Sequence, residues 1–352
     1  MTKLSLGFVP LTDAAPLIVA KERGFFVQVG LDVELVREQA WSSLRDKLVH
    51  GVLDGAQALA PMPLAMSLGL DTPSAAMRAP LVLSRNGNGI TLRADIDDAL
   101  KRGAQRPPEL QAPGGAPGPG LRPLVDARRA SSERPLTFAV VFPWSCHRYQ
   151  LHDWLRAAGL DPVRDVAIVV VPPPRVADAL AAGQIDGFCA GEPWNRLAVT
   201  SGVGRLATTG LELWPDAMEK VLAFRACWAD ANDDVVQRLL QALLRAGTWL
   251  EPLDHRLEAA SMLAAEPYLD QPPSLIAMSL LGLVQSDRND PGRYLAAMHR
   301  FCSPAWAAPV ADDVERLVRA MRDAGDVEAT RAVDWQAVYG GPVLDAARAI
   351  EA

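Results

Sequence analysis

The sequence has few of the residues that form metal sites and disulfide frameworks. Its 352 residues include only four cysteines and five histidines. The cysteines lie far apart, without the close pairing of zinc sites or small disulfide frameworks, so we interpret them as reduced core residues. They are Cys146, Cys189, Cys227 and Cys302. His147 and His152 are five positions apart and would lie on different faces of a helix, which argues against a shared metal.

Long apolar runs and an excess of positive charge are also missing. No apolar run approaches the roughly 20 residues that span a bilayer, and the C-terminus carries no lipidation signal. The formal net charge of -7 argues against an extended nucleic-acid footprint, since phosphate binding depends on clustered Lys and Arg. The first residues, MTKLSLGFVP, have no secretory signal pattern and begin a strand-like pattern at once. We therefore expect a cytoplasmic protein with no direct nucleic-acid or membrane contact.

Motifs of common enzyme classes are not present either. The sequence has no Gly-x-Ser-x-Gly elbow, no His-Glu-x-x-His helix and no P-loop. Its Gly- and Pro-rich segment 102–120 opens no helix after a strand, so it is no dinucleotide fingerprint and is predicted to be a mobile loop. We expect a binding protein without a cofactor, not an enzyme.

A repeat is the most informative feature that the sequence does contain. A strand at 4–10 precedes a helix that Thr12 or Asp13 can cap and Gly24 can end. A second strand at 31–36 precedes a helix in which Ser43 and Asp46 resemble a capping box. The turn Gly-x-x-Asp-Gly at 51–55 then opens a third strand.

The same order returns later in the chain. A strand at 136–142 precedes a helix that Ser145 can cap and Gly159 can end, and a strand at 166–171 precedes a short helix at 175–182. The turn at 183–187 repeats Gly-x-x-Asp-Gly, and we interpret Asp54 and Asp186 as turn residues. Two copies of this pattern predict two βαβαβ lobes with parallel sheets and right-handed crossovers.

The remainder of the chain is predicted to be mainly helical. Five apolar residues recur at helical spacing, namely Val235, Leu239, Leu240, Leu243 and Leu244, and further amphipathic segments cover 274–283 and 312–320. These helices are expected to pack on the first lobe, or to offer one apolar face to a partner. The predicted division is 1–90 for the first part of lobe I, 91–195 for lobe II and 196–352 for the rest of lobe I.

A ligand is expected where the two lobes face each other. In open α/β sheets, ligands bind beyond the carboxyl ends of the strands, where the free N–H groups of helix N-termini favour anions. Pro10 and Thr12 follow the first strand of the first copy, and Trp144 follows the first strand of the second copy. These residues are therefore candidates to line an interlobe cleft.

Four segments closely resemble the nitrate-binding and bicarbonate-binding proteins of ABC importers, whose cytoplasmic relatives are nitrate/nitrite sensors of the NasS type. They are GFVPLTDAAPL at 7–17, the segment 41–48, VVPPP at 170–174 and GEPWN at 191–195. The resemblance extends from the N-terminus to beyond Trp228 and implies an α/β bilobal fold of the type 2 periplasmic-binding-protein class.

The resemblance also implies ligand contacts. The nitrate contacts of the family correspond here to Trp41, His147 and Lys220. A further contact, usually Gln in an Asn-Gly-Gln turn, corresponds to Asn88, whose side chain is one methylene shorter, and Gly89 follows it. Lys220 would supply a full charge, His147 a second donor, and Trp41 an indole N–H or a flat wall. Retention of the lysine favours nitrate or nitrite over bicarbonate.

Each of these residues also has a plainer interpretation. Without the resemblance, Trp41 would be a packing residue and Lys220 a solvated surface charge. His147 could equally serve the hydrogen bonding at a helix start. With the ligand role, Lys220→Ala is expected to abolish nitrate binding with little loss of fold.

The function implied is that of a cytoplasmic nitrate/nitrite sensor. Its partner would be an RNA-binding antiterminator of the ANTAR class, held by the ligand-free sensor and released when the anion binds. One alternative is the periplasmic solute-binding component of a nitrate, nitrite or bicarbonate ABC importer. Another is an enzyme like thiamine-pyrimidine synthase, although the chain lacks a cysteine-rich cluster of that kind.

Overall fold

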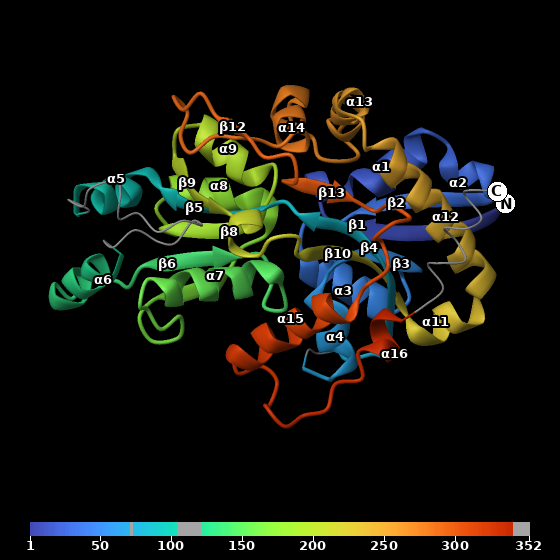
Figure 1. Cartoon of the computed structure of the whole chain (residues 1–352), viewed down its shortest axis with the longest axis horizontal. Coiled ribbons are helices and arrows are strands. Elements are labelled where there is room, and N and C mark those ends of the chain that lie inside the picture. The colour runs from blue at the N-terminus through green and yellow to red at the C-terminus, as the bar shows by residue number, and fades with distance from the viewer. Residues whose placement is uncertain (71–72, 104–120, 341–352) are drawn as a thin grey trace.

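Two sheets form two lobes that lie side by side (Figure 1). The structure is a computed structural model that describes residues 1–70, 73–103 and 121–340. The loop predicted at 102–120 lies outside the described residues from residue 104 onward. The first sheet has the strand order β13-β4-β10-β3-β1-β2 and the second has the order β7-β6-β8-β5-β9. The predicted bilobal α/β architecture is confirmed.

The first copy of the repeat forms one half of the first lobe. Strand β1 pairs in parallel with both β2 and β3. Its elements are β1 (Thr2–Phe8), η1 (Thr12–Ala14), α1 (Ala15–Glu22), α2 (Phe25–Gln28), β2 (Leu31–Arg37), α3 (Trp41–Val49), β3 (Gly55–Leu59) and α4 (Pro61–Ser67). The capping box predicted at Ser43 is wrong: α3 begins at Trp41, its N-cap is Ala40, and the Ser43 hydroxyl donates to the Ala40 carbonyl instead.

The second copy forms the core of the second lobe with the same topology. Strand β6 pairs in parallel with both β7 and β8. The elements are β6 (Thr137–Val140), α7 (Cys146–Ala157), β7 (Ala167–Val170), η3 (Pro173–Arg175), α8 (Val176–Ala181) and β8 (Gly187–Gly191). Ser145 caps α7 as predicted, because its hydroxyl accepts from the backbone N–H of Arg148 at 3.2 Å. The two copies are therefore equivalent βαβαβ units.

The repeated turn aspartates have the same structural role in both copies. The Asp54 carboxylate accepts from the backbone N–H of Ser5 on β1 at 2.8 Å. The Asp186 carboxylate accepts from the backbone N–H of Thr137 on β6 at 2.9 Å. Each aspartate thus ties the turn before the third strand to the first strand of its unit, which confirms the interpretation as turn residues.

The chain passes between the sheets at two places. Strand β4 (Met77–Asn86) belongs to the first sheet and β5 (Asn88–Arg93) to the second, whereas β9 (Gly204–Thr209) belongs to the second and β10 (Met218–Arg225) to the first. Between β5 and β10 the sequence also forms the helices α5 (Ala94–Gly103), α6 (Leu121–Ala130), α9 (Trp194–Thr200) and α10 (Gly210–Leu213). Strands of the second sheet therefore extend from residue 88 to residue 209, whereas the sequence placed lobe II at 91–195.

Helices and short strands follow β10 as far as residue 340. They are α11 (Ala226–Ala231), α12 (Asp233–Trp249), α13 (Leu253–Leu263), α14 (Pro273–Leu280), β11 (Leu283–Val284), β12 (Arg293–Tyr294), β13 (His299–Phe301), α15 (Ala311–Asp323) and α16 (Gln336–Tyr339). Helix α12 buries its predicted leucines against α1 and α2 of the first lobe. In the described part of the chain, no helix combines the length and apolarity needed to cross a bilayer.

Helix α15 connects the two lobes, which the sequence did not predict. At its start, Asp313 forms a bidentate ion pair with Arg85 of β4, with N···O distances of 2.7 and 2.6 Å. Just after its end, Asp326 accepts from Arg148 at 2.8 Å and from the Tyr149 hydroxyl at 2.9 Å, both on α7. Figure 1 shows α15 below β10, between α7 and α16. One end of the helix is thus tied to each lobe.

A close backbone contact on α12 gives a test of this packing. A Cβ built on Gly247 would lie 1.6 Å from the carbonyl oxygen of Cys302. We expect Gly247→Ala to lower the free energy of unfolding by about 1–3 kcal/mol, since the backbone must shift to admit the methyl group. Denaturant unfolding measures the change. The control Thr248→Ala, at the exposed neighbouring position, should change stability by about 0.5 kcal/mol or less. Equal effects would contradict the packing.

Candidate functional site

The site is built around Lys220 on β10, a central strand of the first sheet. The Lys220 side chain is fully buried. The pairing register of β10 against β4 shifts between Met218 and Lys220, so Glu219 lies in a bulge. Adjacent side chains of a regular strand point to opposite faces, and a bulge changes this alternation. The Glu219 carboxylate and the Lys220 ammonium therefore meet at 2.9 Å.

Two carboxyl groups surround the Lys220 ammonium. Its Nζ lies 2.7 Å from Asp13 Oδ2 in addition to the contact with Glu219, and Gln57 donates to Asp13 Oδ1 at 2.7 Å. Burial acts to lower the pKa of Lys220, but Asp13 and Glu219 outweigh it and the net pKa is raised. Burial raises the pKa of Glu219, against the opposing effect of Lys220. Two neighbouring carboxyl groups thus stabilise the protonated, charged form of Lys220.

Trp41 covers the ammonium from the start of α3. The Lys220 Nζ lies 5.7 Å from the centroid of the Trp41 ring, within the range of a cation–π interaction. Trp41 is fully buried, and its indole Nε1 has no hydrogen-bond partner among the described residues. Because a buried indole N–H usually finds a partner, this donor is available to a ligand.

The second lobe contributes His147 and Gln150, which lie one turn apart on α7. His147 is fully buried and its Nδ1 lies 3.7 Å from Glu219 Oε1. Within residues 1–70, 73–103 and 121–340, neither ring nitrogen has a hydrogen-bond partner. Burial and the charge of Lys220 lower the pKa of His147 well below its usual value, so the imidazole is neutral. A neutral imidazole offers one N–H donor and one acceptor.

Asn88 joins this group from the crossing between β4 and β5. Its Nδ2 donates to Gln150 Oε1 at 3.0 Å, while Asn88 Oδ1 and Gln150 Nε2 have no hydrogen-bond partner in the part of the chain that the structure describes. A Cβ built on Gly191 would lie 3.6 Å from both Asn88 Oδ1 and Asp13 Oδ2. Polar atoms from both lobes therefore converge on one buried region.

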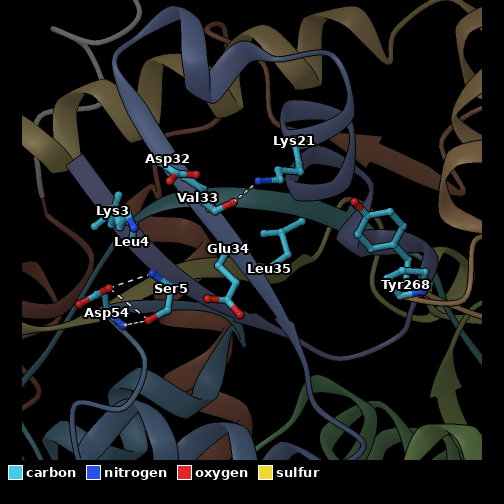
Figure 2. A pocket seen from close by; sticks show the side chains of 11 residues that line it. Lys3, Leu4, Ser5, Lys21, Asp32, Val33, Glu34, Leu35, Asp54 and Tyr268 are labelled. Atoms are coloured by element: carbon cyan, nitrogen blue, oxygen red, sulfur yellow. Dashed lines mark hydrogen bonds between the residues drawn. The ribbon is translucent and has the colours of Figure 1, made fainter. Parts of the chain in front are cut away.

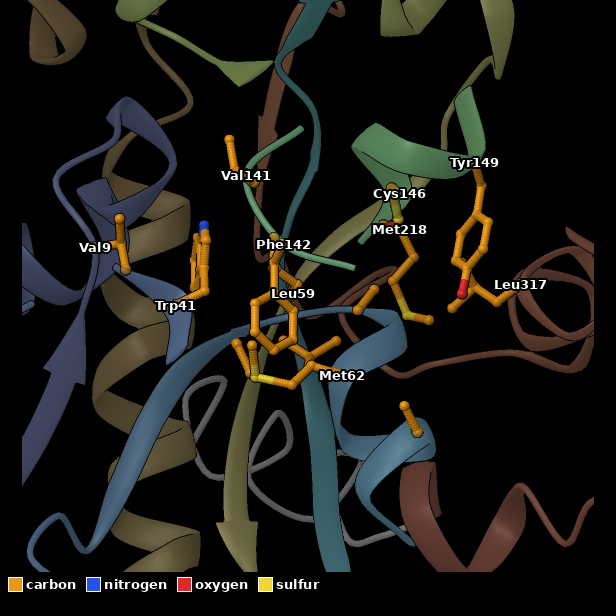
Figure 3. Packing of buried hydrophobic residues seen from close by; sticks show 14 of the residues in the cluster. Val9, Trp41, Leu59, Met62, Val141, Phe142, Cys146, Tyr149, Met218 and Leu317 are labelled. Carbon is orange, nitrogen blue, oxygen red and sulfur yellow. Dashed lines mark hydrogen bonds between the residues drawn. The ribbon is translucent and has the colours of Figure 1, made fainter. Parts of the chain in front are cut away.

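Apolar residues of both lobes surround these polar groups. They form one buried cluster, in which Figure 3 shows Trp41, Phe142, Cys146 and Tyr149. The first lobe contributes Val9, Leu11, Leu44, Leu59 and Met62 as well, and the second contributes Val141, Val176 and Phe188. The lobes are therefore closed on each other, and the polar atoms inside are shielded from water.

The other predicted site residues have different positions. The Pro10 carbonyl accepts from the Trp194 indole at 3.0 Å, and the Thr12 hydroxyl donates to the Glu192 carbonyl at 3.2 Å. Both contacts join the lobes. A Cβ on Gly89 would meet Leu206 at 2.8 Å and Asn195 at 3.1 Å. Trp144 is half-buried against the apolar cluster.

Four of the predicted residues thus come together, namely Trp41, Asn88, His147 and Lys220. The sequence reasoning did not assign the four that surround them, which are Asp13, Gln57, Gln150 and Glu219. Asp13 was predicted to cap a helix, but neither η1 nor α1 has a side-chain cap, because the Asp13 carboxylate binds Lys220 and Gln57. Gln150 could have been found, since it lies three residues after His147 on the same helix face.

A surface depression elsewhere is a weaker candidate (Figure 2). It has a volume of about 550 Å³ and includes Lys3, Ser5 and Asp54, at the starts of β1 and β3. Ligands of open α/β sheets bind at the opposite, carboxyl ends of the strands. Its polar groups also bind each other, since Ser5 bonds to Asp54 and Lys21 Nζ donates to the Val33 carbonyl at 2.6 Å.

The chemistry available between the lobes is that of binding a small polar ligand. Each buried polar atom without a partner costs about 1–3 kcal/mol, so a group of them around one ammonium indicates a place for a ligand. The atoms are Trp41 Nε1, Asn88 Oδ1, His147 Nδ1 and Nε2, Gln150 Nε2 and Glu219 Oε2. Among the described residues, no group of three or more His, Cys, Asp or Glu could hold a metal ion.

Comparisons with known proteins point in the same direction. Residues 1–264 match the NMT1-like family. The chain is 33% identical over 276 residues to the nitrate/nitrite binding protein NrtA of Nostoc sp., covering 76% of this chain and 58% of that one. It is 38% identical over 284 residues to the nitrate import ATP-binding protein NrtC of Synechocystis sp., covering 79% of this chain and 39% of that one. The chain thus spans about half the length of these relatives or less.

A solved structure extends the likeness to the whole chain. The periplasmic nitrate-binding protein NrtA of Synechocystis superposes with a TM-score of 0.89 at 29% identity, over 100% of this chain and 89% of that one. The periplasmic-binding-protein-like fold is therefore shared throughout, including the C-terminal helices beyond the family match.

Removal of the central charge tests the ion cluster. The sequence led us to expect little loss of fold from Lys220→Ala, but Lys220 is fully buried between two carboxyl groups. Loss of one partner of a buried ion pair costs about 3–5 kcal/mol, and we expect Lys220→Met to lower the free energy of unfolding by this amount. Burial raises the pKa of Glu219, and without the ammonium nothing on β10 opposes that effect, so the folded state binds more protons than the unfolded state and stability falls as pH rises.

Denaturant unfolding of Lys220→Met and the wild type at about pH 5 and about pH 8 measures this effect. The deficit should be larger at the higher pH. The same small deficit at both values would show that Asp13 and Glu219 do not depend on the ammonium.

Proposed function

The chain belongs to the NMT1-like family, and we propose that it is a nitrate- or nitrite-binding protein that holds the anion between its two lobes, not an enzyme. One observation carries this proposal: buried polar atoms without partners, from both lobes, surround a buried ammonium at the lobe interface. The relatives named for nitrate and nitrite binding support the choice of ligand.

The physical basis of binding is closure of the lobes. Trp41 and Lys220 belong to the first lobe and His147 to the second, so only the closed arrangement offers all their donors to one ligand. A ligand that binds the closed state better than the open state shifts the population toward closure. Nitrate is small, planar and singly charged, and it presents only acceptor oxygens to the donors of Trp41, His147, Gln150 and Lys220.

Titration calorimetry with nitrate, nitrite, bicarbonate and sulfate tests the ligand. We expect nitrate or nitrite to bind, and His147→Ala to weaken binding about 10- to 100-fold, since a hydrogen bond to a charged group contributes about 1.5–3 kcal/mol. His255→Ala is the matched control. His255 lies on α13 of the first lobe and stacks on Trp249, so it is not one of the groups proposed to bind the anion. No heat from nitrate or nitrite, or equal losses in the two variants, would contradict this assignment.

We further propose that closure is read by a partner, an ANTAR-type RNA-binding antiterminator, and that the protein acts in the cytoplasm. Two relatives that match this chain are named as ATP-binding proteins of nitrate and bicarbonate import. A protein that binds ATP for import works in the cytoplasm, where ATP is available. The part of these relatives that matches this chain would then also lie in the cytoplasm, which supports the proposed location. Delivery of the anion to an ABC permease is the alternative.

Size-exclusion chromatography of the protein with an ANTAR-type antiterminator tests the sensor proposal. We expect a complex without ligand that dissociates on addition of nitrate. A coupling free energy of about 1–3 kcal/mol would lower partner affinity about 5- to 150-fold. His147→Ala should keep the complex intact at nitrate concentrations that release the partner from the wild type. A complex that ignores nitrate would rule out the sensor mechanism and leave anion binding untouched.

A further inference from the structure

Glu219 presents a charge conflict within the proposed site. It is fully buried, beside the ammonium that would attract an anion. One cation with two ionised carboxylates would leave the cluster with a net negative charge. An ionised Glu219 would then oppose the attraction that Lys220 exerts on an anion at a similar distance. The site suits an anion only if one carboxyl group is neutral.

The hydrogen bonds show which carboxyl group can be neutral. Both Asp13 oxygens accept hydrogen bonds, one from Gln57 and one from Lys220 at 2.7 Å each. Glu219 Oε1 accepts from Lys220 at 2.9 Å, but Glu219 Oε2 is buried and no described residue forms a hydrogen bond with it. Nitrate carries only acceptor oxygens, so an ionised Oε2 could make no hydrogen bond to it, whereas a protonated Oε2 could donate one.

Burial is the largest influence on the protonation of Glu219, and it favours the neutral form by raising the pKa. The charge of Asp13 also raises this pKa, whereas Lys220 and a hydrogen bond with Cys146 lower it. The neighbouring titratable groups from the other elements do not compete for the proton, because burial lowers the pKa of His147 and raises those of the two thiols. The charged or titratable groups around Glu219 are Asp13 of η1, Lys220 of β10, Cys146 and His147 of α7, and Cys189 of β8.

We propose that Glu219 is a carboxylic acid in the anion-bound protein, that its Oε2–H donates a hydrogen bond to the anion, and that binding takes up one proton wherever Glu219 is ionised in the free protein. This inference rests on the proposed function and deepens it. Glu219 thereby selects anions without a proton of their own, since an ionised Glu219 would instead accept from a ligand that carries an O–H, such as bicarbonate.

Calorimetric titration with sodium nitrate over about pH 6 to 10, in pairs of buffers with different ionisation enthalpies, tests the proposal. We expect constant affinity at low pH and then a fall of about tenfold per pH unit. In the falling range, the observed heat should depend on the buffer with a slope of about one proton. Glu219→Gln keeps the shape and a donor but cannot ionise, so its affinity should stay constant with no proton uptake. Glu38→Gln, at another buried glutamate that pairs with a lysine, Lys47, should behave like the wild type.

The outcomes separate the two proposals. Nitrate binding by the wild type with constant affinity and no buffer dependence through about pH 10 would overturn the role of Glu219 and leave nitrate binding in place. A pH profile and proton uptake in Glu219→Gln equal to those of the wild type would also overturn it, since another group would then take the proton. No binding of nitrate or nitrite at any pH would overturn the proposed function and this inference together.

Discussion

The buried ammonium of Lys220 is the constraint on which the rest of the site depends. A lysine that is fully buried must be paired, because the transfer of an isolated charge from water into a protein interior is very costly. Asp13 and Glu219 supply that pairing from the first lobe alone. Lys220 can therefore keep its charge before any contact with the second lobe, and the site is preorganised on one side of the cleft.

The second lobe completes the site with neutral groups. His147, Gln150 and Asn88 bring donors and acceptors but no net charge, since burial and Lys220 keep His147 neutral. The first lobe thus supplies the charges and the second supplies hydrogen bonds. Both units contribute because the residues that follow their first strands, Val9 after β1 and Val141 after β6, lie in the same buried cluster.

Much of the fold was readable from the sequence because it rests on local patterns. Ser145 caps its helix, and Asp54 and Asp186 tie their turns to the first strands, all from short-range chemistry. The ion cluster was not readable, because Asp13 and Lys220 are 207 positions apart and a regular strand would turn Glu219 away from Lys220. The four central site residues could be predicted only through the family resemblance. By its chemistry alone, Trp41 could equally have been a core residue and Lys220 a solvated surface charge.

Helix α15 has a mechanical consequence for the closed protein. Its two ends are fixed by Arg85 in one lobe and Arg148 in the other, and its 13 residues form a bar about 20 Å long. A lobe movement that increased the distance between Arg85 and Arg148 would have to break one of these two ion pairs. A rotation of the lobes about the axis of α15 would leave both intact. The stiffness of one helix thus limits the direction in which the lobes can move apart, and substitution of Arg85 or Arg148 can alter that movement without removing a group of the site.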